Sequence, residues 1–117
     1  MRAGVSEVTR VLELAARPVI YNLTLSSANT EFSQVLPAGI RKFSIQCRDT
    51  SVDIKLAFVE GESGTNFLTV LGNSAYNEDL IHAPGGFTLT LYVQSTSTAS
   101  PVVEIVAWSI DPSGGDL

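Results

Sequence analysis

Few side chains in this 117-residue chain have the chemistry of a catalytic group. His82 is the only histidine and Cys47 the only cysteine. The residues after His82, Ala83-Pro84-Gly85-Gly86, supply neither a nucleophile nor an oxyanion signature. Cys47 falls at an inward position of an expected strand, where a thiol behaves as a small apolar group. We therefore expect a protein that is not an enzyme and has no catalytic residue.

The acidic residues do not have the spacing of a metal site. Structural zinc needs about four nitrogen or sulfur ligands, and this chain has one histidine and one cysteine. The pairs Glu78-Asp79 and Glu60-Gly61-Glu62 lack the spaced Asp and Asn residues of a calcium loop, and they are typical of exposed turns. Gly61 and Gly64 do not form a phosphate loop, because no lysine or expected helix follows them. The sequence predicts no metal and no cofactor.

Charge is distributed unevenly along the chain. All seven basic residues lie at or before position 55 beside five acids, so residues 1–55 carry 7 − 5 = +2. Residues 56–117 carry seven acids and no base, which gives −7. Such asymmetry orients a partner or a neighbouring copy through complementary fields. Nucleic acid is not an expected partner, because phosphate binding needs clustered Lys and Arg.

No segment of the sequence has the pattern of a targeting signal or a membrane span. Residues 1–7 lack the apolar core of a secretory signal peptide, and nowhere do 18 apolar residues follow one another. We therefore expect synthesis in the cytoplasm and no membrane partner. On that expectation the glycosylation sequon Asn22-Leu23-Thr24 is a chance occurrence.

Composition and alternation favour an all-β fold. Val, Ile, Thr, Phe, Tyr and Trp account for 38 of the 117 residues, and Lys occurs only twice. Alternating apolar and polar residues predict seven or eight short strands. The segments are 19–25, 32–36, 43–47, 52–58, 67–71, 75–81, 87–94 and 102–110. We expect a single antiparallel β-sandwich over residues 18–110, jelly-roll-like, with a β-barrel as the alternative.

Two hairpins are expected within this sandwich. Turn-forming residues 48–51 separate two alternating segments, and pairing Cys47 with Val52 places the apolar residues of both on one face. By the same reasoning, residues 95–101 form a loop that pairs Val93 with Val103.

The second hairpin predicts an unusual outer face. Its last strand is apolar on both sides, and strands of that kind are normally covered on both faces. Lys, a common guard of sheet edges, is missing from this hairpin. We therefore expect identical copies or a large partner to bury this face, with aromatic and aliphatic anchors at Tyr92, Val106 and Trp108. A rival interpretation is a sugar-stacking platform of Tyr76, Tyr92 and Trp108.

Two terminal segments flank the expected sandwich. Residues 1–17 fit an N-terminal arm, a first strand or a short helix, because their apolar residues satisfy both spacings. As an arm, this segment would contact a neighbour through Val8, Val11 and Leu12. Residues 111–117 have the composition of a flexible C-terminal tail.

Four segments resemble small β-sandwich virion proteins of tailed bacteriophages. They are residues 36–49 (LPAGIRKFSIQCRD), 55–65 (KLAFVEGESGT), 91–95 (LYVQS) and 103–108 (VEIVAW), and the likeness spans roughly residues 21–110. The N-terminal segment is not covered by it. The resemblance carries over no individual functional residue, because such proteins work through surfaces.

The resemblance implies a structural protein present in many copies in the virion. It implies a capsid decoration (cement) protein that binds across shell subunits and stabilises the particle, or a head or tail accessory protein. The implied partners are the major capsid protein or another virion protein, together with copies of the chain itself as a homo-oligomer. The alternative function is an accessory module of a tail or head fibre that binds a host glycan or another virion protein.

Overall fold

The computed structural model describes residues 16–79, 81 and 88–110. The expectations for the N-terminal arm, including Val8, Val11 and Leu12, and for the C-terminal tail lie outside these residues. His82 also lies outside them. The first strand begins at Ala16, two residues before Pro18, at which the sequence predicted its start.

The described residues form eight β-strands and no helix. All eight expected strands are present, most of them shorter than the apolar alternation predicted. Their bounds are β1 (Ala16–Thr24), β2 (Phe32–Val35), β3 (Ile40–Cys47), β4 (Ile54–Ala57), β5 (Leu68–Val70), β6 (Ala75–Glu78), β7 (Thr90–Gln94) and β8 (Val102–Ile110). The prediction of an all-β antiparallel sandwich is confirmed.

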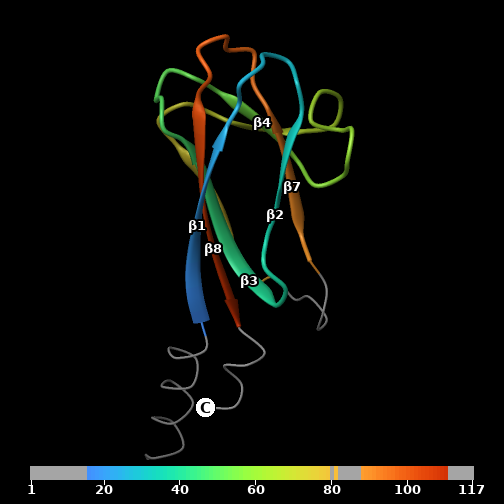
Figure 1. Ribbon diagram of the computed structural model, residues 1–117, viewed down its shortest axis with the longest axis vertical. Helices are drawn as coiled ribbons and strands as arrows, with labels where there is room; N and C mark the ends of the chain where they lie inside the picture. Colours follow the sequence, from blue (N-terminus) through green and yellow to red (C-terminus); the bar gives the residue numbers. More distant parts are fainter. Residues whose placement is uncertain (1–15, 80, 82–87, 111–117) are drawn as a thin grey trace, which may run out of the picture.

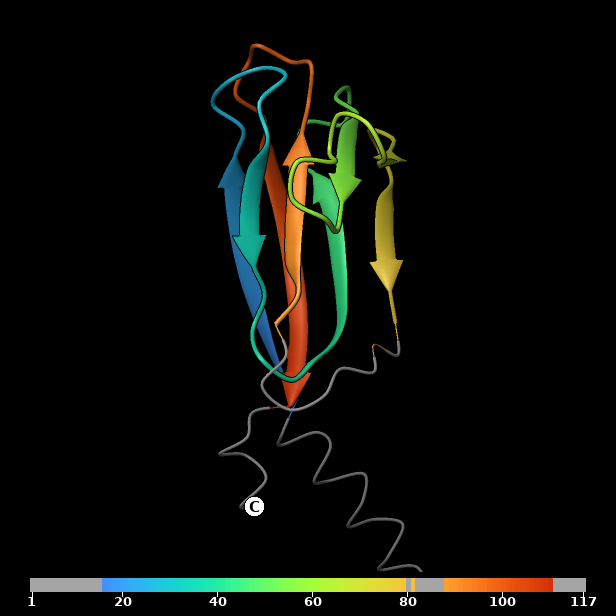
Figure 2. The same ribbon diagram turned by 90° about the vertical axis from the view of Figure 1, so that its right-hand side faces the viewer.

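The strands form two four-stranded antiparallel sheets packed face to face (Figures 1 and 2). Sheet A has the order β1-β8-β3-β6, and sheet B has the order β2-β7-β4-β5. Apart from β4 and β5, consecutive strands belong to different sheets, so the chain crosses the sandwich at almost every connection. This order is that of a jelly roll.

Both expected hairpins are wrong. β3 belongs to sheet A and pairs with β6 and β8, whereas β4 belongs to sheet B. Likewise β7 pairs with β2 and β4, whereas β8 lies between β1 and β3. In a sandwich the inward faces of both sheets are apolar, so strands that face each other across the core have the same alternation as strands paired in one sheet. Alternation therefore determines which face of a strand is buried, but it does not determine which strand pairs with it.

The core consists of the inward side chains of both sheets. Phe43, 1% exposed, is the largest fully buried side chain among the described residues. Its ring centroid lies 6.1 Å from that of Phe58 and 6.0 Å from that of Tyr76. The other buried residues of the cluster are Leu25, Leu36, Ile40, Ile45, Cys47, Ile54, Leu56, Val70, Leu91, Val93, Val103, Ile105 and Ala107.

The turn after β5 packs closely against the turn before β4. The Gly72 N–H donates a hydrogen bond of 2.7 Å to Asp53 Oδ1. A Cβ atom added at Gly72 would lie 2.3 Å from the backbone oxygen of Thr50. Because that atom belongs to the backbone, the two turns must move apart to admit a side chain.

We expect Gly72→Ala to lower the free energy of unfolding by about 1–3 kcal/mol, the usual cost of overpacking. Urea denaturation at equilibrium measures this change. Gly64→Ala is the control, since an added Cβ there meets only the flexible end of the Gln94 side chain, at 3.3 Å. A Gly72→Ala protein as stable as the wild type would contradict the close packing of these turns.

Candidate docking surface

The outer surface of sheet A is built around β8, which is the second strand of that sheet, between β1 and β3. Val103, Ile105 and Ala107 point into the core and are fully buried. The residues that alternate with them point outward and remain half-buried, among them Val106 and Trp108. The last strand is thus apolar on both sides, as its sequence predicted.

Strand register arranges this surface in three rows. Trp108 lies between Pro18 and Lys42, Val106 between Ile20 and Ser44, and Glu104 between Asn22 and Gln46. We refer to these nine residues, together with Arg48 at the end of β3, as the sheet A face.

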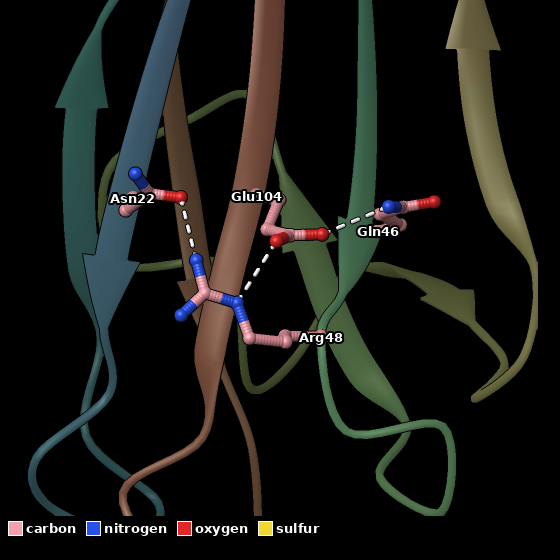
Figure 3. Close-up of polar contacts among 4 residues, drawn as sticks. All are labelled: Asn22, Gln46, Arg48 and Glu104. Atoms are coloured by element: carbon pink, nitrogen blue, oxygen red, sulfur yellow. Dashed lines mark hydrogen bonds and ion pairs between the residues drawn. The ribbon is translucent and has the colours of Figure 1, made fainter.

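A hydrogen-bonded network fixes the polar part of the sheet A face (Figure 3). Arg48 Nε donates to Glu104 Oε2 at 2.9 Å, and Arg48 Nη2 donates to Asn22 Oδ1 at 3.1 Å. Gln46 Nε2 donates to the other carboxylate oxygen, Glu104 Oε1, at 2.9 Å. The network therefore joins β1, β8 and β3 and holds its planar groups in place before any partner binds.

These donors favour the ionised form of Glu104. The hydrogen bond from Gln46, followed by that from Arg48, lowers the pKa of Glu104 below its ordinary value of 4.5. A carboxyl group with a depressed folded-state pKa adds stability above its unfolded pKa, and that stability is lost as the pH falls through the folded pKa.

We expect Gln46→Leu to raise the pKa of Glu104 toward its ordinary value. The side-chain carboxyl resonance of Glu104, followed by NMR against pH, measures this shift. Asn22→Ala, which leaves both donors to Glu104 in place, is the control and should shift the titration less. A midpoint that Gln46→Leu does not change would show that this hydrogen bond does not form in solution.

The other part of the sheet A face is mostly apolar, with Lys42 as its one charged residue. Ile20 is 66% exposed, and Lys42 Nζ lies 4.4 Å from the centroid of the Trp108 ring, a cation–π contact. A shallow depression of about 280 Å³ lies where the two parts meet and is lined by Ile20, Asn22, Ser44, Gln46, Glu104 and Val106. An apolar patch beside fixed donors and acceptors suits a protein interface.

The outer surface of sheet B differs, because a loop of the chain itself covers part of it. Residues 58–67 connect β4 to β5 and fold back over the sheet (Figure 2). Ser63 is fully buried there, with its hydroxyl 2.9 Å from Gln94 Oε1 of β7 and also bonded to the Glu31 carboxylate. Lys55 Nζ of β4 lies 4.9 Å from the centroid of the Phe67 ring.

The structure does not bring the three expected anchors together. Val106 and Trp108 lie on the sheet A face, but Tyr92 is in β7 and points outward from sheet B. The expectation of one shared surface depended on pairing β7 with β8, which does not occur. Tyr76 packs against Phe43, and its hydroxyl donates to Glu78 Oε1 at 2.8 Å. Tyr76, Tyr92 and Trp108 therefore do not form a common platform.

The sequence analysis missed the polar network and the exposure of Ile20. Asn22, Gln46 and Glu104 each occupy outward positions in the alternation, which was the available signal. Only the register places them side by side, because their strands are far apart in the sequence.

The side chains that could bind a metal ion do not cluster in the described part of the chain. Cys47 is 6% exposed, and burial raises the pKa of its thiol. Among residues 16–79, 81 and 88–110, no group of three or more His, Cys, Asp and Glu side chains is placed to hold a metal ion. No helix in the same residues is long and apolar enough to cross a membrane.

Comparisons with known proteins assign this chain to no family. Neither protein-family models nor curated proteins gave a match to this chain. Among solved structures, a de novo designed double-stranded β-helix is similar over 80% of this chain and 99% of its own, with 11% identity and a TM-score of 0.48. PliG from Aeromonas hydrophila, a periplasmic inhibitor of g-type lysozyme, is similar over 84% of this chain and 88% of its own, with 14% identity and a TM-score of 0.39.

Proposed function

We propose that this protein is a non-enzymatic virion structural protein, a capsid decoration (cement) protein that binds across shell subunits through its sheet A face. One observation carries the proposal. Trp108, Val106 and Ile20 form an outward apolar patch directly beside a preformed polar network. The patch has no covering segment among the described residues, in contrast to the outer surface of sheet B.

The chemistry of the sheet A face is suited to binding a protein. Trp and Arg are the residue types that most often dominate interface energetics, and both are present in Trp108 and Arg48. Because Arg48 is already held by Glu104 and Asn22, little side-chain entropy is lost when a partner binds. Binding to the assembled shell in preference to loose subunits then stabilises the shell by mass action.

The resemblance of residues 36–49 and 103–108 to phage virion proteins supports the choice of a virion shell as partner. These two segments form β3 and β8, which contribute most of the sheet A face.

Cosedimentation with purified particle components tests this proposal. The protein should sediment with assembled heads and not bind dissociated major capsid protein, since the full site needs adjoining subunits. Binding to isolated tails in place of heads would favour a tail accessory protein. Absence of binding to heads and tails alike would refute a virion role.

A further inference from the structure

The β1 edge of sheet A has a definite hydrogen-bonding pattern. β1 is an edge strand whose partner in the sheet is β8, and Leu25 N–H donates to Pro101 O at 2.9 Å just beyond the strand. In antiparallel pairs, residues that exchange hydrogen bonds with a given neighbour alternate with residues that do not. The register therefore directs the backbone groups of Leu23, Tyr21 and Val19 toward β8.

The alternate residues direct their backbone groups away from β8, toward the open edge. Ile20, Asn22 and Thr24 each present an N–H and a C=O there, while Pro18 presents only a C=O because proline has no N–H. No described segment pairs with this edge. Unpaired edges of this kind are templates for another strand unless they are guarded.

We propose that a second copy of the chain pairs with this edge, β1 against β1 in antiparallel orientation, about a two-fold axis at Asn22. In this register Asn22 lies opposite Asn22 of the second copy, and Ile20 opposite Thr24. Each such pair exchanges two backbone hydrogen bonds. The register also leaves Pro18 outside the paired residues. The two sheets A then form one continuous sheet of β6-β3-β8-β1 and its symmetry copy.

The side chains of β1 are compatible with this pairing. The opposed residues Asn22 and Asn22, and Ile20 and Thr24, are uncharged, so no like charges meet across the axis. On the inner side of the strand, Tyr21 and Leu23 are only partly buried. Copies of these two side chains would face each other across the new strand pair and cover one another.

The other three sheet edges are poorer candidates. The edge strands β2, β5 and β6 have four, three and four residues, against nine in β1. Leu36 N–H donates to Leu89 O at 2.8 Å, so the groups that β2 directs outward are those of Ser33 and Val35. Fewer backbone bonds are available at each of these shorter edges, and β1 is therefore the expected site. The inference concerns contacts between copies and does not depend on shell docking.

Light scattering across a dilution series of the purified chain, combined with two matched proline variants, tests the pairing. Ile20→Pro removes an N–H that points to the open β1 edge of sheet A, and Ser33→Pro removes the equivalent N–H at the β2 edge of sheet B. Neither change removes a bond of the existing ladders. We expect a dimer for the wild type and for Ser33→Pro, and a dissociation constant roughly 10- to 100-fold higher for Ile20→Pro, which loses two hydrogen bonds per dimer.

Hydrogen exchange on the wild type supplies a readout that needs no variant. In the dimer the amides of Ile20, Asn22 and Thr24 should exchange as slowly as those of Tyr21 and Leu23, and on dilution only the first three should become fast. If Ile20→Pro is found unfolded by circular dichroism, Ile20→Lys at the same exposed position replaces it. A monomer at all soluble concentrations, fast exchange at the three edge amides in the dimer, or a dimer lost in Ser33→Pro and kept in Ile20→Pro would each overturn the proposal.

Discussion

Replacing Phe43 by alanine should lower the free energy of unfolding by about 3–5 kcal/mol. Phe43 is 1% exposed in β3, a strand flanked on both sides in sheet A, and its ring contacts Phe58 and Tyr76. Loss of the ring removes apolar surface from the core and leaves a cavity between sheets that the backbone hydrogen bonds of β6 and β8 keep from collapsing.

Urea denaturation of Phe43→Ala beside Phe67→Ala measures this effect. Phe67 is 37% exposed and contacts Lys55 on the outer side of sheet B, so its loss should cost less than the loss of Phe43. Equal destabilisation by the two substitutions would contradict the burial of Phe43 in the core.

The second large effect is expected at the sheet A face. Trp108→Glu should weaken binding to assembled heads about 30-fold or more, since truncating an aromatic anchor at an interface costs at least about 2 kcal/mol. The substitution also places a second carboxylate on the outward side of β8, four residues from Glu104. Trp108 points outward, so the fold should remain intact, and the thermal unfolding curve checks that it does.

Ser33→Glu is the matched control for this variant. Ser33 is exposed on the outer surface of sheet B, and the substitution adds the same charge there. It should leave the affinity for heads unchanged. Equal weakening by both substitutions would indicate a general effect of negative charge, and no weakening by Trp108→Glu would exclude the sheet A face as the docking surface.

The strands could be predicted from the sequence because alternation is a local property. Phe43, Ile45 and Cys47 alternate with polar residues, and all three are buried. Strand pairing could not be predicted in the same way, because Cys47 pairs with Val103, a residue far away in the sequence. Six residues separate β3 from β4, and they carry the chain to the opposite sheet instead of closing a hairpin.

The candidate site was predictable only where it depends on a single strand. Val106 and Trp108 were identified because β8 by itself is apolar on both sides. Tyr92 was assigned to the same surface through an assumed pairing, and the structure places it on the opposite sheet. The contact of Arg48 with Asn22 joins β1 to the end of β3 across β8, so it requires the whole sheet order.

Oxidative footprinting of the protein, free and bound to heads, tests the central claim most directly. Hydroxyl radicals oxidise exposed side chains, and mass spectrometry reads the extent at each residue. The proposed docking predicts that Trp108 becomes protected on the particle, while Tyr92, which points outward from sheet B, is oxidised equally in both states. Oxidation of Trp108 at the same rate in the free and the bound protein would contradict it.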